Sequence, residues 1–284
     1  MKPQAFEIMA ACLRNGSGLV IGPDKMYLLE ARLGRILKQR GLRDLDALAE
    51  RVAADRVVAR DVVEAMTTNE SFFFRDDKPF SHFRTQALPR LLAARPPGAR
   101  LRIWSAASSS GQEAYSLAMI LAECRAQIGG RSFEIVGTDI SREQLGRAQE
   151  GMYTQFEVQR GLPMQLLVRY FRKEGANWRV AEGLRSTVTF KEWNLLSDLR
   201  GLGQFDIVFC RNVLIYFDQP TKARVLEAIA RQMPADGLLY LGGAETVLGI
   251  TDRFVAAPGE RGVYWLSDAV RTVARTTGVA LVAG

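Results

Sequence analysis

The chain has almost no histidine and little cysteine, and both shortages exclude chemistry. Only one of its 284 residues is histidine, His82, so a Ser-His-Asp triad or a histidine-based metal site has almost nothing to be built from. The three cysteines, Cys12, Cys124 and Cys210, lie far apart without metal-ligand spacing, which favours reduced, packed thiols. We expect no metal, and we expect His82 to be an incidental surface residue.

Long hydrophobic runs are missing as well. No run approaches the roughly 18 apolar residues of a membrane-spanning helix, and the first residues, MKPQAFEIMAACLRNGSG, lack the apolar core of a secretion signal. The formal net charge is +7, yet basic and acidic residues are interleaved rather than blocked. The sequence therefore predicts a soluble cytoplasmic protein that favours acidic partners, does not insert into membranes and carries no nucleic-acid arm.

The first 66 residues carry helical patterns. Residues 24–41, DKMYLLEARLGRILKQRG, begin with an acid, end at a glycine and repeat apolar side chains along one helix face. Arg32, Arg35 and Lys38 fall on the opposite face. They form either an ordinary solvated surface or a cationic strip for an acidic partner.

From residue 100 onward, strand and helix patterns alternate. This order predicts an α/β fold in which helices cover both faces of a mainly parallel sheet. Residues 163–192 break the rhythm with short β-like pieces and polar turns, which predict a small antiparallel insertion. The apolar stretches that we assign to the main sheet are 101–107, 133–141, 187–196, 205–218, 237–245 and 261–266.

The loop after the first of these strands has an unusual composition. Residues 105–111, SAASSSG, join a buried strand to a helix start, which is where α/β proteins bind nucleotides. Neither GxxxxGK[ST] nor GxGxxG is present. Asp139 ends the next strand and can accept hydrogen bonds from both hydroxyls of a ribose, although an acid there also suits a helix N-cap. Other polar residues at strand ends are Glu113, Asn194, Arg211, Asn212 and Tyr216.

These features suit a ligand that has no phosphate. S-adenosylmethionine carries adenine, ribose, a sulfonium and an amino acid, so its pocket needs close backbone approach and a hydrogen-bonding acid rather than a lysine. Glu113 is placed to take the ammonium group of such a ligand. On these residues alone, a nicotinamide-dependent enzyme stays open as an alternative.

Five stretches, in order along the chain, resemble the CheR-type chemotaxis receptor methyltransferases, which are protein-glutamate O-methyltransferases. They are MTTNESFFFRD (66–76), IWSAASSSGQEAYSLAM (103–119), GTDIS (137–141), NLL (194–196) and FDIVFCRNVLIYFD (205–218). The resemblance implies a Rossmann-like class I methyltransferase domain over residues 77–270, with a small β-subdomain at 160–190. It also implies an all-α receptor-docking domain and linker over 1–76, and we expect a loosely ordered tail over 271–284.

The resemblance further implies roles for single residues. Arg75 and Tyr216 correspond to the active-site positions of the family, and Arg32, Arg35 and Lys38 gain a task in docking the substrate. Ser71 stands where relatives often have threonine, and Gln112 replaces the first acid of the family's GEE sequence. S-adenosylmethionine, with S-adenosylhomocysteine as product, is expected to contact Asn69, Ser71, Arg75, Glu113 and Asp139, and on its adenine side Asn194, Leu195, Arg211 and Asn212.

The implied chemistry agrees with the shortage of histidine. A glutamate carboxylate is already ionised at pH 7, so it can attack a sulfonium methyl without a general base. The protein then has to align and partly desolvate the reacting groups, with Arg75 orienting the carboxylate and Tyr216 positioning it. The implied partner is the cytoplasmic helical domain of chemoreceptors. The short turn in residues 170–180 lacks the glycine pattern of tail-binding relatives, so we expect no tether to a receptor C-terminal peptide.

Two other classes stay open. A nucleic-acid methyltransferase fits the positive charge but not the absence of basic and aromatic strips. A cofactor-binding signalling adaptor without catalysis fits the fold but not the presence of Asn69, Arg75, Asp139 and Tyr216 together. We expect the large aromatic residues to serve packing, namely Phe72–Phe74, Trp104 and Trp193.

Overall fold

The N-terminal part of the protein is a bundle of helices. The computed structural model describes residues 1–267, so the expected tail at 271–284 lies outside the described residues. Asp44 and Asp55 accept backbone N–H bonds at the starts of the third and fourth helices, and Gly41 ends the second in a left-handed conformation. The expected all-α N-terminal domain is confirmed. Its helices are α1 (Pro3–Ser17), α2 (Met26–Arg40), α3 (Leu45–Ala54) and α4 (Arg56–Met66), with a 3₁₀ turn η1 (Pro23–Lys25).

The second part is built on a seven-stranded sheet with the order β6-β2-β1-β7-β8-β10-β9. The strands from β6 to β8 in this order pair in parallel, whereas β10 runs antiparallel to β8 and β9. The expected mainly parallel sheet is confirmed, although the sequence did not predict β9. The strands are β1 (Leu101–Ala106), β2 (Phe133–Asp139), β6 (Val188–Glu192), β7 (Ile207–Cys210), β8 (Leu238–Leu241), β9 (Phe254–Ala256) and β10 (Val263–Leu266).

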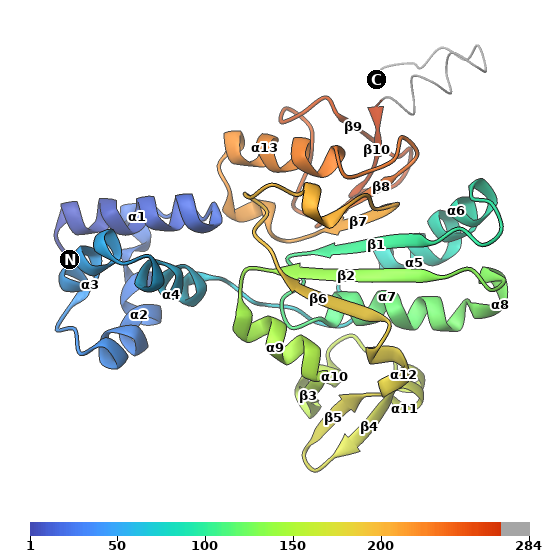
Figure 1. The fold of residues 1–284 in the computed structure, drawn as a ribbon, viewed down its shortest axis with the longest axis horizontal. Helices are drawn as coiled ribbons and strands as arrows, with labels where there is room; N and C mark the ends of the chain where they lie inside the picture. Colours follow the sequence, from blue (N-terminus) through green and yellow to red (C-terminus); the bar gives the residue numbers. More distant parts are fainter. Residues whose placement is uncertain (268–284) are drawn as a thin grey trace.

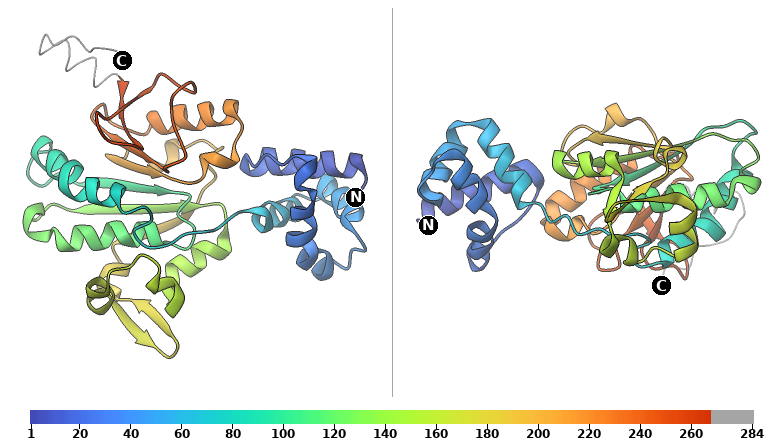
Figure 2. Two further views of the ribbon diagram at one scale, coloured as in Figure 1. Left: turned by 180° about the vertical axis from the view of Figure 1, so that it is seen from behind. Right: turned by 90° about the horizontal axis from the view of Figure 1, so that it is seen from below.

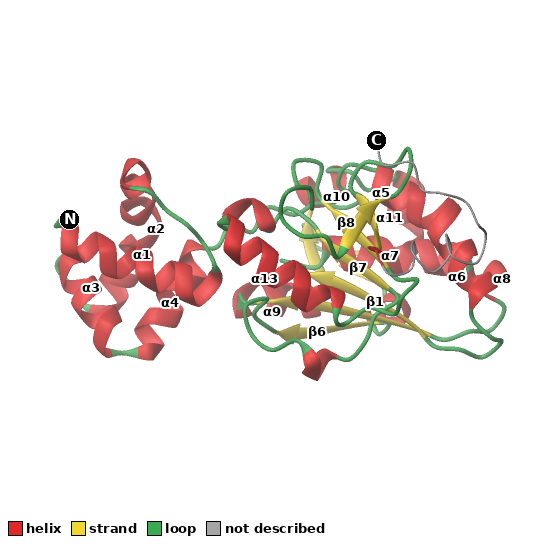
Figure 3. Ribbon diagram, turned by 90° about the horizontal axis from the view of Figure 1, so that it is seen from above, coloured by secondary structure: helices red, strands yellow, loops and turns green. Residues whose placement is uncertain are grey.

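Helices lie on both faces of this sheet (Figure 3). One core contains Tyr115 of α7 together with the helices before β1, and the other contains Trp104 together with α13. Within residues 1–267, no helix has both the length and the apolar character needed to cross a bilayer. The helices are α5 (Lys78–His82), α6 (Leu88–Ala94), α7 (Gln112–Glu123), α8 (Arg125–Ile128), α9 (Arg142–Glu150) and α13 (Gln219–Ala230), with short helical turns η2 (Phe83–Ala87), η3 (Arg200–Leu202) and η4 (Leu214–Tyr216).

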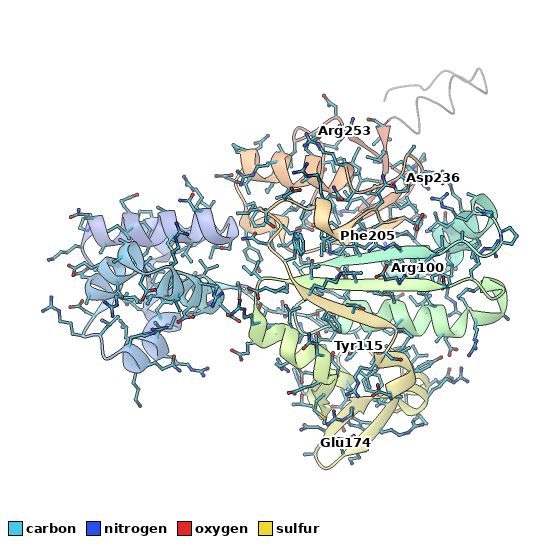
Figure 4. All side chains as sticks on the ribbon, viewed as in Figure 1. Arg100, Tyr115, Glu174, Phe205, Asp236 and Arg253 are labelled. Carbon is cyan, nitrogen blue, oxygen red and sulfur yellow. The ribbon has the colours of Figure 1, made fainter. Side chains whose placement is uncertain are left out.

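An insertion between α9 and β6 forms a second, three-stranded antiparallel sheet, as expected. It begins with β3 at Met152, earlier than residue 160, and β6 already joins the main sheet at Val188. Tyr153 packs edge-on against Tyr115 of α7, which Figure 4 labels where the two sheets meet. The insertion contains β3 (Met152–Thr154), α10 (Gln155–Gln159), α11 (Met164–Tyr170), β4 (Phe171–Glu174), β5 (Asn177–Val180) and α12 (Glu182–Arg185).

The helical domain stands at the end of the molecule where β1 and β2 finish (Figures 1 and 2). Hydrogen bonds tie it to the α/β domain there. The Asn194 side-chain amide donates to the Gly16 carbonyl at 2.7 Å, and the Val20 N–H donates to the Tyr216 carbonyl at 3.1 Å. The carboxyl ends of the parallel strands, which bind ligands in open α/β sheets, therefore face a second domain rather than solvent.

His82 is buried, so the expectation of an incidental surface residue is wrong. Only 7% of the residue is exposed, and its Nδ1 lies 2.8 Å from the Tyr240 hydroxyl. The sequence pattern missed this because His82 lies on α5, a helix of only five residues, which is too short to show a periodic apolar face. Burial lowers the pKa of this imidazole, and the charge of Glu260 opposes the shift.

This burial predicts a loss of stability in mild acid. The unfolded chain binds a proton at His82 more readily than the folded protein, so the free energy of unfolding should fall as pH drops below about 6.5, by up to about 1.4 kcal/mol per pH unit. Urea denaturation of the wild type and of His82→Asn between pH 7.5 and 5.5 measures the difference. Equal pH slopes in the two proteins would contradict the prediction.

Candidate active site

The loop after β1 is shaped by residues in the left-handed region. Ala107 and Ser109 have φ values of 56° and 50°, and Gly111 has 92°. A Cβ atom at Gly111 would lie 2.9 Å from the Ala148 Cβ, so a side chain does not fit there. The Ser109 hydroxyl donates to the Asn69 carbonyl at 3.0 Å, which joins the loop to the interdomain linker. The Ser108 hydroxyl is buried and has no hydrogen-bond partner among residues 1–267, so it is available to a ligand.

Asp139 organises the neighbouring strand end. Its residue is 8% exposed, and its two carboxylate oxygens accept the N–H groups of Ser109 at 2.8 Å and Ser141 at 2.9 Å. Burial raises the pKa of this carboxyl, and the backbone N–H bonds oppose the rise. The N-cap of α9 is Ser141, whose hydroxyl accepts from the Gln144 N–H, so the N-cap alternative for Asp139 is wrong.

Glu113 and Arg211 form a buried ion pair. The Arg211 Nη1 lies 3.1 Å from Glu113 Oε2, and the Ser105 hydroxyl donates to Glu113 Oε1 at 2.8 Å. Burial raises the pKa of Glu113, and the positive charge of Arg211 opposes that rise. The second terminal nitrogen of Arg211, Nη2, donates to the Asp76 carboxylate at 2.6 Å. The sequence placed Arg211 on the adenine side with Asn194, whereas the structure pairs its guanidinium with these two carboxylates.

Arg75 lies on the linker between the domains. Its Nη1 donates to the Glu70 carbonyl at 2.9 Å, and its guanidinium lies 5.2 Å from the centre of the Phe72 ring. Arg160, from the insertion, lies 4.3 Å from the same ring and bonds the Glu70 carboxylate at 2.7 Å. Phe73 is fully buried as expected. Phe72 contacts both arginines and also lines the cavity, so the expected packing accounts for only part of its contacts.

One cavity brings the expected site residues together. It measures about 1010 Å³ with its open mouth included, and the N-terminal domain contributes Ser17 and Leu19 to its wall. Arg32, Arg35 and Lys38 lie outside it. Trp104 is fully buried as expected, whereas Trp193 is half-buried and lines the cavity. The sequence-predicted residues on the cavity wall are Asn69, Ser71, Arg75, Glu113, Asp139, Asn194, Leu195, Arg211, Asn212 and Tyr216.

The sequence missed two carboxylates that support the walls. Glu64 of α4 accepts the Ser141 hydroxyl at 3.0 Å and the Glu143 N–H at 2.9 Å, which fastens the helical domain to the start of α9. Glu245, in the loop after β8, accepts backbone N–H groups of the segment that follows β7. The position of Glu245 at the end of an apolar stretch was a signal available in the sequence, whereas nothing marked Glu64 within its helix.

The cavity fits S-adenosylmethionine. It offers a buried acid for ribose hydroxyls, a Ser108 hydroxyl with no partner in the described part of the chain, and a backbone loop that a ligand can approach closely. No lysine is among the described residues that line it. No group of three or more histidine, cysteine or acidic side chains within residues 1–267 could hold a metal ion. A Rossmann-like sheet with this set of strand-end residues defines a class I methyltransferase.

Comparison with known proteins gives the family. The model of the CheR methyltransferase SAM-binding domain matches residues 69–263, and the model of the CheR methyltransferase all-alpha domain matches residues 4–67. The chain belongs to the CheR methyltransferase family, whose members are S-adenosylmethionine-dependent enzymes.

Relatives match along nearly their whole length. The chain is 40% identical over 265 residues to chemotaxis protein methyltransferase 1 of Pseudomonas aeruginosa, covering 92% of this chain and 96% of the relative. It is 38% identical over 266 residues to chemotaxis protein methyltransferase Cher2 of Pseudomonas putida, with the same two coverages. A chemotaxis protein methyltransferase of Vibrio parahaemolyticus is 37% identical over 256 residues, covering 88% of this chain and 92% of the relative.

Proposed function

We propose that this protein transfers the methyl group of S-adenosylmethionine to glutamate carboxylates in the cytoplasmic helical domain of chemoreceptors, forming methyl esters. The observation that carries the proposal is the placement of Arg75 on the wall of the cavity that also contains Asp139. A carboxylate-binding cation thus shares one cavity with a ribose-binding acid. The only histidine is bonded to Tyr240 in the core, which suits a nucleophile that is already ionised.

Each wall of the cavity has its own task in holding the cofactor. Asp139 accepts the ribose hydroxyls, and Glu113 takes the ammonium group while Arg211 balances its buried charge. Asn194 and Leu195 contact the adenine, and S-adenosylhomocysteine is the product that these residues release. When bound, the cofactor supplies an electrophilic methyl group on a sulfonium; no metal takes part.

Arg75 and Tyr216 act on the incoming substrate. The guanidinium of Arg75 offers a planar pair of N–H donors that matches a carboxylate, and it orients the nucleophilic oxygen towards the methyl group. Tyr216 borders the same cavity and positions that carboxylate. Because no proton has to be removed, the contribution of these residues is alignment and exclusion of water.

A labelling experiment tests the proposed function. The protein is incubated with methyl-labelled S-adenosylmethionine and receptor-containing membranes, and the label is then exposed to mild base. We expect label on the receptor that mild base releases, since an ester is hydrolysed where an amine or nucleobase methyl group is not. Base-stable label would contradict glutamate esterification, and firm cofactor binding without any label would favour the adaptor.

The cationic strip of Arg32, Arg35 and Lys38 on α2 is a prediction about the partner, and the hydrogen bonds of Arg32 support limiting the strip to the other two residues. Arg32 donates to the carbonyls of Met66 at 2.8 Å and Thr67 at 3.1 Å, so its side chain fastens the linker instead of being free for docking. Arg35 and Lys38 are exposed. We propose that these two dock an acidic face of the receptor.

Reversing both exposed charges should weaken receptor use. We expect Arg35→Glu with Lys38→Glu to raise the apparent KM for receptor by about fivefold and to flatten its salt dependence, because rim charges act mainly on association. Initial rates at several salt concentrations measure both effects. Arg51→Glu with Arg56→Glu, on α3 and α4, is the matched control. Equal KM values for the two double variants would remove this docking surface.

A further inference from the structure

The buried carboxylate of Glu245 accepts hydrogen bonds from the backbone of the segment between β7 and η4. Glu245, in the loop after β8, is 9% exposed. Each of its two carboxylate oxygens accepts two backbone N–H groups, so the side chain joins two loops that follow neighbouring parallel strands. Oε2 accepts from Asn212 at 2.8 Å and Gly242 at 2.6 Å, and Oε1 accepts from Val213 at 3.0 Å and Ile215 at 3.3 Å.

The backbone of this segment needs such an anchor. Asn212 has a φ of 59°, in the left-handed region that asparagine tolerates better than most residues. The backbone N–H groups of Asn212, Val213 and Ile215 all donate to Glu245, and a carboxylate with two acceptor oxygens satisfies all three. The neighbouring loop is pressed against the same point, since a Cβ atom at Gly242 would lie 2.7 Å from Asn212 Nδ2 and 2.8 Å from Glu245 Oε2.

The anchored segment carries part of the cavity wall. Asn212 and Tyr216 line the cavity on this side. Ile215, between them, is 45% exposed, so burial of its own side chain does not fix the segment there. The position of the Tyr216 ring relative to the cavity thus depends on hydrogen bonds to Glu245 as well as on packing.

We propose that Glu245 is a positioning residue for methyl transfer, acting through the segment that it holds and setting the places of Asn212 and Tyr216. This inference rests on the proposed function. Glu245 does not line the cavity itself, so its effect reaches the reacting groups only through this backbone.

Glu245→Gln tests the proposal because the glutamine side chain has nearly the same shape as that of glutamate. One carboxylate oxygen becomes an NH₂ group, which faces two N–H donors and accepts from neither. We expect kcat to fall by at least about tenfold, because small displacements of aligned groups are costly, while the KM for receptor stays within about twofold because receptor docking lies elsewhere. Glu227→Gln, on α13 and paired with Arg231, is the control that keeps its rate. A kcat within about twofold of the wild type would overturn the proposal.

A double-variant cycle separates positioning from general damage. With S-adenosylmethionine saturating, so that any effect of Asn212 on cofactor affinity is not measured, adding Glu245→Gln to Tyr216→Ala should lower kcat by no more than about a further twofold. Losses that multiply would overturn the proposal. Gly242→Ala, whose Cβ would press on both Asn212 Nδ2 and Glu245 Oε2, should reproduce the kcat loss if Glu245→Gln proves unstable. Ester formation by the wild type is measured first, so failure of the proposed function is visible before any variant is compared.

Discussion

Replacing Asp139 with asparagine is expected to weaken S-adenosylmethionine binding by at least about 100-fold. The carboxylate has both oxygens directed at N–H donors, from Ser109 and Ser141, and has lone pairs left for two ribose hydroxyls. Asparagine keeps one acceptor oxygen and turns the other position into a donor. Hydrogen bonds to a charged group contribute about 1.5–3 kcal/mol each, and two are weakened or lost. Isothermal titration calorimetry with cofactor and with product measures the effect.

Two controls keep this result interpretable. Asp198→Asn changes an exposed aspartate that pairs with Arg200, and we expect cofactor affinity to be unchanged. Thermal denaturation of Asp139→Asn without ligand shows how much of the loss comes from the loop after β1. Binding within about threefold of the wild type would contradict the assignment of Asp139 to the ribose.

Arg75→Ala is expected to lower kcat for receptor methylation by about 100- to 1000-fold while cofactor binding changes little. In the proposed function this guanidinium orients the substrate carboxylate, and removing an oriented donor from a reacting centre costs about this much. Arg75 is partly exposed and is held by the Glu70 carbonyl rather than by a buried network. The variant should therefore fold normally. Single-turnover methyl transfer at saturating cofactor measures the effect.

Arg160→Ala is a closely matched control for that variant. Both arginines contact Glu70 and the Phe72 ring, but only Arg75 of the two is on the described cavity wall. Loss of Arg160 alone should leave kcat within about threefold of the wild type. If the two variants lose activity equally, the cluster around Phe72 acts as a unit and Arg75 has no separate role with the substrate.

The sequence predicted the parts of the fold and site that local patterns encode. The period of α2, the all-apolar β7 and the small-residue loop after β1 all follow from short stretches, and strand ends gather at one edge of a parallel sheet. These rules are sufficient to bring Asp139, Asn194 and Tyr216 to one cavity. The outer strand β9 has only three residues, too few to show an alternation.

What the sequence could not predict depends on contacts between distant segments. His82 of α5 is buried and bonded to the hydroxyl of Tyr240 of β8, which lies 158 residues further along the chain. The Arg32 guanidinium, on α2, donates to backbone carbonyls at the end of α4, which lie 34 and 35 residues further along the chain. Glu64 and Glu245 likewise bind backbone groups far along the chain, and no local pattern specifies such pairings.

The hydrogen bond from Asn194 to the Gly16 carbonyl joins the two domains beside the cavity. Ser17 and Leu19 of the N-terminal domain line the same cavity, so both domains contribute to the proposed cofactor pocket. A tilt of the helical domain would change the shape of this pocket and weaken cofactor binding. By thermodynamic reciprocity, bound cofactor then resists the tilt. Under the proposed function, bound cofactor therefore stabilises one arrangement of the helical domain that carries Arg35 and Lys38.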